Sequence, residues 1–238
     1  IGHQTVQDSM FLDGLEDAYD KGRLMGTFAE DCAEKYQFTR EAQDQYAIAS
    51  LSNALDAERS GAFDAEITPV TVHARTGEEI ITRDEQPGKA KPGKIPTLKP
   101  AFRKDGTVTA ANASSISDGA AALVLSSDGG RARVLGHASH AQAPGWFTTA
   151  PVPAAQKLLR KIGWSVDNVD LWEVNEAFAV VPMAFMHEMG IPRDIVNVNG
   201  GACALGHPIG ASGTRIIVTL LHALETRGLK RGVAAICI

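Results

Sequence analysis

The feature that most constrains the fold is a repeated alternation of strand-like and helix-like segments after residue 131. Apolar runs typical of buried strands alternate with longer segments in which apolar residues recur at helical spacing. Gly190 and Gly228 stand where two of these helices would end. The predicted strands are 132–140, 169–174, 194–199 and 232–238, and the predicted helices are 151–164, 175–190 and 210–228. This alternation predicts an α/β fold in which helices cover a buried sheet.

The first 130 residues follow a different pattern. Thr39 is placed to cap a helix, and Gly61 stands where that helix would end. Residues 65–85 predict a β-hairpin, because two strand-like runs flank a short turn. Residues 86–104 contain four prolines and several lysines, which predicts an irregular basic loop. A further strand is predicted at 122–127.

The composition argues against two classes of function. The chain has 238 residues, of which 44% are hydrophobic and 21% charged, the balance of an ordinary soluble globular protein. The formal net charge of -5 argues against nucleic acid as the main partner, since phosphate binding needs a basic face. No apolar run approaches the ~20 residues of a membrane-spanning helix, so we expect no membrane partner.

The cysteines and the chain ends set further expectations. Cys32, Cys203 and Cys237 are an odd number and lie far apart in sequence, which predicts a reduced, intracellular setting. The chain begins at Ile1 and stops at Ile238 inside a predicted strand, whereas termini usually lie in exposed segments. We therefore expect further residues on both sides, and a targeting segment among them is an open alternative.

Three polar side chains follow predicted strands. Asn175 comes directly after the strand at 169–174, His207 lies in the loop after the next strand, and Cys237 lies near the end of the last one. In α/β sheets, groups beyond the carboxyl ends of parallel strands gather in one crevice. If these strands are parallel neighbours, the imidazole, the amide and the thiol converge.

Each of these residues also has an ordinary structural interpretation. His207 is flanked by Gly206, Pro208 and Gly210, and this rigid yet glycine-rich setting favours a functional role over an incidental surface histidine. Taken alone, Asn175 is interpreted as a helix N-cap. Taken alone, Cys237 is interpreted as a small core residue.

Metal and nucleotide sites are not indicated. Cys203 and His207 are four residues apart, but no second pair of ligands accompanies them, so the sequence predicts no metal. The glycine-rich stretch 197–215 fits neither G-x-G-x-x-G nor G-x-x-x-x-G-K-[ST].

The motifs together resemble the thiolase family. "NEAFA" at 175–179, "NGGACALGHPIGASGTR" at 199–215 and "CI" at 237–238 have the order and spacing of that family. Supporting stretches are "MGTFAED" at 25–31, "LKPAFRKDGTVTAANASSISDGAAA" at 98–122 and "APVPA" at 150–154. The resemblance implies a layered α-β-α-β-α fold of two similar halves. It implies a loop domain at 1–100, the end of the N-terminal half at 101–128 and the C-terminal half at 129–238.

The resemblance also implies a reaction and catalytic roles. Thiolases condense two acyl-coenzyme A thioesters, or cleave a 3-ketoacyl thioester with coenzyme A, through a covalent acyl-cysteine. His207 matches the histidine that activates the acyl-carrying cysteine and contributes to an oxyanion hole. Asn175 matches the asparagine that holds a water there, and Cys237 matches the cysteine that moves the α-proton. None of the three cysteines matches the acyl carrier, so this chain alone is not expected to turn over.

Binding residues, partners and setting are implied as well. Ser114 matches a residue that contacts the pantetheine arm, and three apolar residues match contacts near the thioester or that arm: Met25, Phe102 and Phe178. Phe147 stands where many members carry methionine, which reshapes the acyl pocket. The basic loop has two open interpretations: it contacts the phosphates of coenzyme A, or it is simply a solvated loop. We expect no cofactor other than the coenzyme A substrate, a dimer or homotetramer, and a cytoplasmic location.

Three functional alternatives remain open at this point. The leading one is a short-chain thiolase that acts on acetyl-CoA or a small 3-ketoacyl-CoA. The second is a long-chain degradative 3-ketoacyl-CoA thiolase, which differs in pocket size. The third is a non-catalytic acyl-CoA-binding relative, and the joint presence of Asn175, His207 and Cys237 argues against it.

Overall fold

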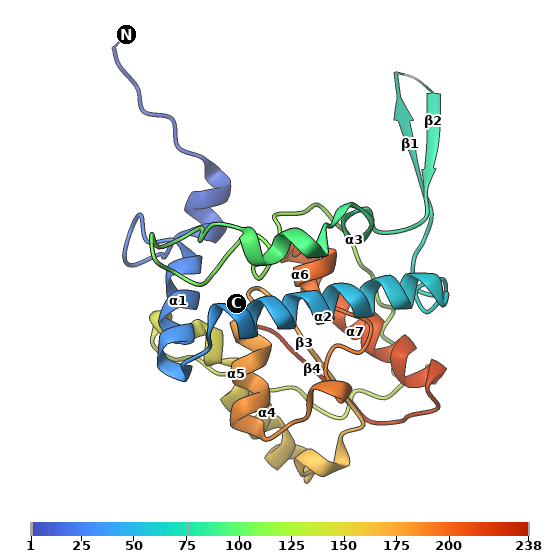
Figure 1. Cartoon of the computed structure of the whole chain (residues 1–238). Helices are drawn as coiled ribbons and strands as arrows, with labels where there is room; N and C mark the ends of the chain where they lie inside the picture. Colours follow the sequence, from blue (N-terminus) through green and yellow to red (C-terminus); the bar gives the residue numbers. More distant parts are fainter. Residues whose placement is uncertain (1, 76, 238) are drawn as a thin grey trace.

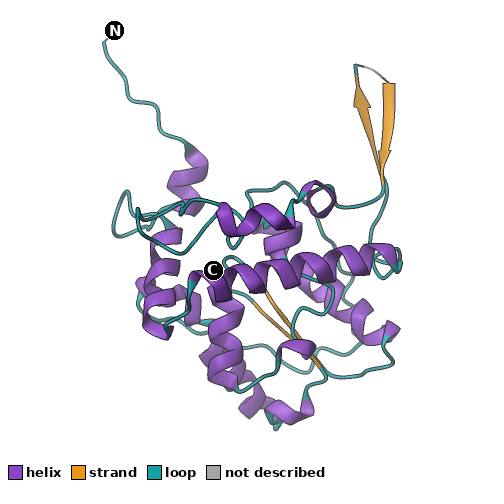
Figure 2. Cartoon of the chain, in the orientation of Figure 1, coloured by secondary structure: helices purple, strands orange, loops and turns teal. Residues whose placement is uncertain are grey.

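The computed structural model describes residues 2–75 and 77–237. Figure 1 and Figure 2 show helices surrounding a small sheet, with a hairpin that stands away from the rest. The helices are α1 (Met25–Tyr36), α2 (Arg40–Arg59), α3 (Gln86–Lys89), α4 (Pro151–Ile162), α5 (Val180–Met189), α6 (Ala202–Leu205) and α7 (Ile209–Thr226), and the strands are β1 (Val70–Ala74), β2 (Gly77–Ile81), β3 (Leu171–Val174) and β4 (Gly232–Ala235). This mixture agrees with the predicted α/β class.

The β3–β4 sheet is parallel and covered on both faces. Leu171 is opposite Gly232, and Val174 is opposite Ala235. Trp172 and Val174 face the core formed with α4 and α5, whereas Leu171 packs with Leu220 and Ala223 of α7. Alternate residues of a strand point to opposite faces, so each face of β3 packs against a different helical layer.

Three of the predicted strands do not form. Residues 122–127 and 132–140 have no regular structure, and no partner strand among the described residues pairs with them. Val124 is 96% exposed, so its apolar side chain has no core to enter. The segment 194–199 makes a single parallel bridge from Val196 to Trp172 after a short 3₁₀ turn. These predictions are wrong because an apolar run becomes a strand only where a partner supplies hydrogen bonds.

The hairpin prediction is confirmed for the described residues. Val70–Ala74 and Gly77–Ile81 pair antiparallel, and Figure 1 shows them projecting beyond the ends of the helices. Thr76 in the turn lies outside the described residues, as do Ile1 and Ile238 at the chain ends.

Helix α2 also follows the prediction. The Thr39 side chain accepts a hydrogen bond from the Ala42 backbone N–H, which makes it the expected N-cap. Residues 86–104, which were predicted to form an irregular loop, contain α3 and a 3₁₀ turn at Pro92–Thr97. The prediction is wrong for these two elements. Proline is tolerated in the first turn of a helix, and Pro87 and Pro92 occupy such positions.

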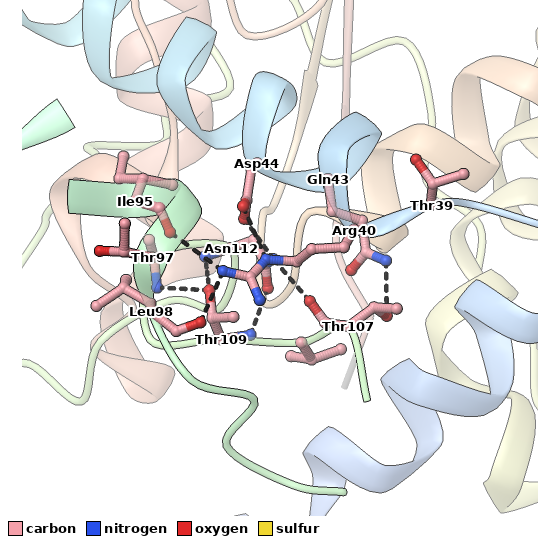
Figure 3. Close-up of polar contacts among 12 residues, drawn as sticks. Thr39, Arg40, Gln43, Asp44, Ile95, Thr97, Leu98, Thr107, Thr109 and Asn112 are labelled. Carbon is pink, nitrogen blue, oxygen red and sulfur yellow. Dashed lines mark hydrogen bonds and ion pairs between the residues drawn. The ribbon is translucent and has the colours of Figure 1, made fainter. Parts of the chain in front are cut away.

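A polar network joins α2 to the segment that follows this turn (Figure 3). Arg40 pairs with Asp44 and donates to the carbonyl oxygens of Ile95 and Leu98, at 3.1 and 2.8 Å. Asn112 in turn donates to Asp44 at 3.0 Å. These bonds satisfy partly buried charges and fix residues 95–112 against α2. The same segment runs on to the predicted binding residue Ser114.

Among the helices that the structure describes, none has both the length and the hydrophobicity needed to cross a membrane.

Candidate active site

The parallel pairing of β3 and β4 brings two of the predicted residues to one edge. Asn175 directly follows β3, and its backbone N–H donates to the Ala235 carbonyl at 2.9 Å. Cys237 comes two residues after Ala235, the last residue of β4. The sequence analysis required that the strands be parallel neighbours. β3 and β4 meet this requirement.

Asn175 also contacts His207. Its side-chain nitrogen Nδ2 lies 3.3 Å from His207 Nε2, and the Asn175 side chain is fully buried. The N-cap interpretation is wrong, because α5 begins at Val180 and its N-cap residue is Ala179. The other side-chain atom of Asn175, Oδ1, is buried and has no hydrogen-bond partner among the residues that the structure describes. A buried acceptor without a protein partner is costly, so Oδ1 is available to accept a hydrogen bond at this position.

His207 is held from its other nitrogen as well. Its Nδ1 lies 2.5 Å from the Ser212 hydroxyl, and its backbone N–H donates to the Ser115 carbonyl at 3.2 Å. Burial, and to a smaller extent the charge of Arg215, lower the pKa of the imidazole. His207 is therefore a neutral, oriented imidazole, able to accept a proton.

Close packing explains much of the glycine content of this loop. A Cβ added at Gly201 would lie 2.4 Å from the Glu176 carboxyl carbon, and one at Gly206 would lie 2.2 Å from Ser117 Oγ. At Gly200, which has φ +79°, a Cβ would lie 2.5 Å from the Ser50 carbonyl oxygen. Backbone thus approaches other groups more closely than any side chain permits.

A buried carboxylate that the sequence reasoning missed organises the loop. Glu176 is fully buried and accepts hydrogen bonds from Tyr46 Oη at 2.8 Å and Ser50 Oγ at 2.7 Å, both on α2. It also accepts from Asn197 Nδ2 at 2.8 Å and from the Cys203 backbone N–H at 3.0 Å. The available signal was an acidic residue two positions after the last residue of a predicted buried strand. Glu176 thereby links α2, the end of β3 and the start of α6.

Cys237 lies at the edge of the main hydrophobic core. It is 5% exposed, and burial raises the pKa of its thiol to about 12. The predicted apolar contact residues pack in the same cluster: Met25, Phe102, Phe147 and Phe178. Two edge-to-face ring pairs order this cluster, Phe102 with Phe178 and Phe28 with Phe147. The structure therefore places these residues and Cys237 in or against one hydrophobic core.

Two further predicted contacts have partners within the chain. The Ser114 hydroxyl is half-buried and donates to the Ala177 carbonyl at 2.9 Å, so it supports the segment around Asn175. Lys89, in the basic loop, is exposed and pairs with Glu85 at 3.0 Å. No group of three or more potential metal ligands occurs among residues 2–75 and 77–237.

Comparisons with known proteins agree with these motifs. The family model described as "Thiolase, N-terminal domain" matches residues 1–129, and "Thiolase, C-terminal domain" matches residues 130–238. The chain belongs to the thiolase family. A relative named "Probable acetyl-CoA acetyltransferase" from Dictyostelium discoideum is 48% identical over 99% of this chain and 59% of its own length. The chain thus spans about three fifths of the length of the curated relatives that it matches.

Solved structures of thiolases share the fold. The acetyl-CoA acetyltransferase of Bacillus anthracis superposes with a TM-score of 0.90 at 38% identity, over 100% of this chain and 62% of that one. The Acat5 thiolase of Ascaris suum, solved in complex with coenzyme A, has a TM-score of 0.83 at 41% identity, over 100% and 63% of the two chains. The thiolase fold predicted from the motifs is therefore confirmed.

Proposed function

We propose that this chain carries the acid–base groups of a thiolase-type acyltransferase, which condenses two acetyl-CoA molecules or cleaves a short 3-ketoacyl-CoA with coenzyme A. The contact between Asn175 Nδ2 and His207 Nε2 is the observation that supports this most, together with Asn175 Oδ1, a buried acceptor with no partner among the described residues. Relatives named acetyl-CoA acetyltransferase favour the short-chain substrate. The coenzyme A complex of the Ascaris suum thiolase supports a coenzyme A thioester as ligand.

The proposed roles of Cys237 and His207 follow from where each proton goes during the reaction. Cys237 gives its proton to the coenzyme A thiolate that leaves when the carrier thiol is acylated. The resulting Cys237 thiolate then takes the α-proton of acetyl-CoA, and the C–H electron pair becomes an enolate whose oxygen needs fixed donors. His207 accepts the proton of the acyl-carrying thiol at Nε2, and the resulting N–H then donates to that oxygen. The enolate carbon attacks the acyl carbonyl: a C–C bond forms, the C–S bond to the carrier thiol breaks, and that thiolate takes the proton back.

Proton exchange on acetyl-CoA tests this proposal, measured on this chain together with the segment that supplies the acyl-carrying cysteine. In D₂O, ¹H NMR follows the loss of the methyl signal of acetyl-CoA. We expect His207→Ala to slow exchange by at least ~10² and Cys237→Ala to abolish it. Cys203→Ala is the matched control, because it removes a half-buried thiol that does not follow β3 or β4. Exchange at the parent rate in Cys237→Ala would refute the role of that thiol.

The wider setting is part of the same proposal. We propose a cytoplasmic homo-oligomer, a dimer or homotetramer, with no cofactor beyond the coenzyme A thioester and with no nucleic-acid or membrane partner. Free Cys32, Cys203 and Cys237 support a reducing compartment. Light scattering coupled to size-exclusion chromatography tests the assembly, and a mass equal to that of one chain would overturn it.

A further inference from the structure

Ser212 is a buried hydroxyl next to the candidate catalytic histidine. It is the fourth residue of α7 and is 1% exposed. Its Oγ lies 2.5 Å from His207 Nδ1 and 3.0 Å from the Pro208 carbonyl oxygen. Neither the motif resemblance nor the reasoning about strand ends assigns it a role.

The direction of these hydrogen bonds follows from what each atom can do. The Pro208 carbonyl can only accept, so the Ser212 hydroxyl directs its single hydrogen there. The Ser212 oxygen is then an acceptor toward His207, and Nδ1 must carry the hydrogen of the neutral ring. On the opposite side of the ring, Asn175 Nδ2 can only donate, so its long contact of 3.3 Å favours an unprotonated Nε2. Both neighbours of the imidazole therefore select the same tautomer.

We propose that Ser212 is a positioning residue that holds His207 in the Nδ1–H form and so keeps Nε2 free to accept the proton of the acyl-carrying thiol. This inference rests on the proposed function for its catalytic consequence, although the tautomer itself exists without substrate. The hydrogen bond that the other nitrogen makes decides which nitrogen of a histidine can act as a base. When Nε2 gains a proton, Nδ1–H stays bonded to Ser212, and the ring keeps its orientation.

The surroundings of the ring agree with this role. Burial and the nearby Arg215 disfavour a charged imidazole and lower the pKa of His207, so a neutral tautomer is the resting form. The backbone of His207 is held by Ser115, and the flanking Gly206 approaches Ser117. The loop thus fixes where the ring lies, and Ser212 fixes which nitrogen carries the hydrogen.

NMR of the ring nitrogens tests the tautomer directly. The chain is labelled with ¹⁵N-histidine, and two-bond ¹H–¹⁵N correlations distinguish protonated from unprotonated ring nitrogens. The chain has seven histidines, and the signals of His207 are those that disappear in His207→Gln. We expect the Nδ1–H pattern in the parent and in Ser212→Thr, which retains a hydroxyl, and a mixture of tautomers in Ser212→Ala. Thr214→Ala, on the same helix, is the control and retains the parent pattern.

Kinetics then test the catalytic consequence. We expect Ser212→Ala to slow α-proton exchange at saturating acetyl-CoA by at least ~10-fold with an unchanged KM, and Ser212→Thr to restore it in part. An Nε2–H pattern in the parent would overturn the inference without any variant, as would an unchanged tautomer in Ser212→Ala. If the tautomer depends on Ser212 but the parent shows no exchange, the proposed function fails while the anchoring role of Ser212 stands.

Discussion

Replacing Glu176 with glutamine tests whether the buried carboxylate organises the glycine-rich loop. The two oxygens of Glu176 accept from different pairs of donors. Oε1 faces Tyr46 Oη and Asn197 Nδ2, and Oε2 faces Ser50 Oγ and the Cys203 backbone N–H. The two hydroxyls can rotate and accept instead, but the two N–H groups can only donate. Whichever way the glutamine amide turns, its NH₂ therefore faces an N–H that it cannot satisfy.

The magnitude follows from this count. One hydrogen bond to a charged acceptor is lost, worth ~1.5–3 kcal/mol, and one buried donor is left unpaired, at ~1–3 kcal/mol. Part of this loss is offset because glutamine needs no burial of a charge. We expect Glu176→Gln to lower the free energy of unfolding by about 3 kcal/mol, which for a chain of this size lowers Tm by roughly 6–12 °C.

Urea unfolding followed by circular dichroism measures the effect, and Glu188→Gln is the matched control. Glu188 also accepts a hydrogen bond from a tyrosine hydroxyl, from Tyr36 at 2.7 Å, but this pair is exposed. The control should unfold within about 0.5 kcal/mol of the parent, as most surface substitutions do. If Glu176→Gln proved as stable as Glu188→Gln, the donors around Glu176 would not depend on a carboxylate, and its organising role would be refuted.

Two further predictions concern the loop and the sheet. Gly200→Ala should destabilise the chain by about 2–4 kcal/mol, because it combines a positive φ with a backbone clash. Gly210→Ala is the control and should not destabilise the chain, because no described atom lies within 4 Å of the added Cβ. Equal stabilities of the two variants in urea unfolding would contradict the packing argument. Burial raises the pKa of Glu173 to about 8 despite the opposing charge of Arg215. Between pH 4.5, its ordinary pKa, and pH 8, the Glu173 carboxylate therefore gains a proton when the chain folds. Its contribution to stability is therefore complete below pH 4.5 and lost as the pH rises through 8, at up to ~1.4 kcal/mol per pH unit between these values. Thermal unfolding between pH 5 and 8 should show a shallower decline in Glu173→Gln than in the parent, and parallel curves would contradict the shift.

The sequence predicted elements whose signals are local. The Thr39 cap and the glycine after α2 marked that helix, and the hairpin followed from two strand-like runs around a short turn. The helices now described as α4, α5 and α7 were predicted from apolar periodicity and terminal glycines. Strands 122–127 and 132–140 could not be judged in this way, because an apolar run gives no information on whether a partner strand lies beside it.

The candidate site was predictable where topology alone determines position. Parallel strands bring their carboxyl ends together, which placed Asn175 and Cys237 at one edge. The supporting groups were not predictable in the same way. The bond from Tyr46 to Glu176 spans 130 residues, and the bond from His207 to Ser212 depends on the turn at Pro208 rather than on any spacing rule.

The interpretation of Asn175 shows why a local preference can be overruled at a functional site. An asparagine between a strand and a helix usually caps the helix, but here the chain first makes a tertiary connection. Phe178 bridges to Ala113, and the Ala179 backbone N–H donates to Asn112, before α5 begins. These bonds delay the helix by four residues beyond Asn175, so no helix amide is within reach of its side chain. The amide is thereby left free to face His207, and the segment around Asn112 and Ser114 helps to orient this candidate catalytic pair.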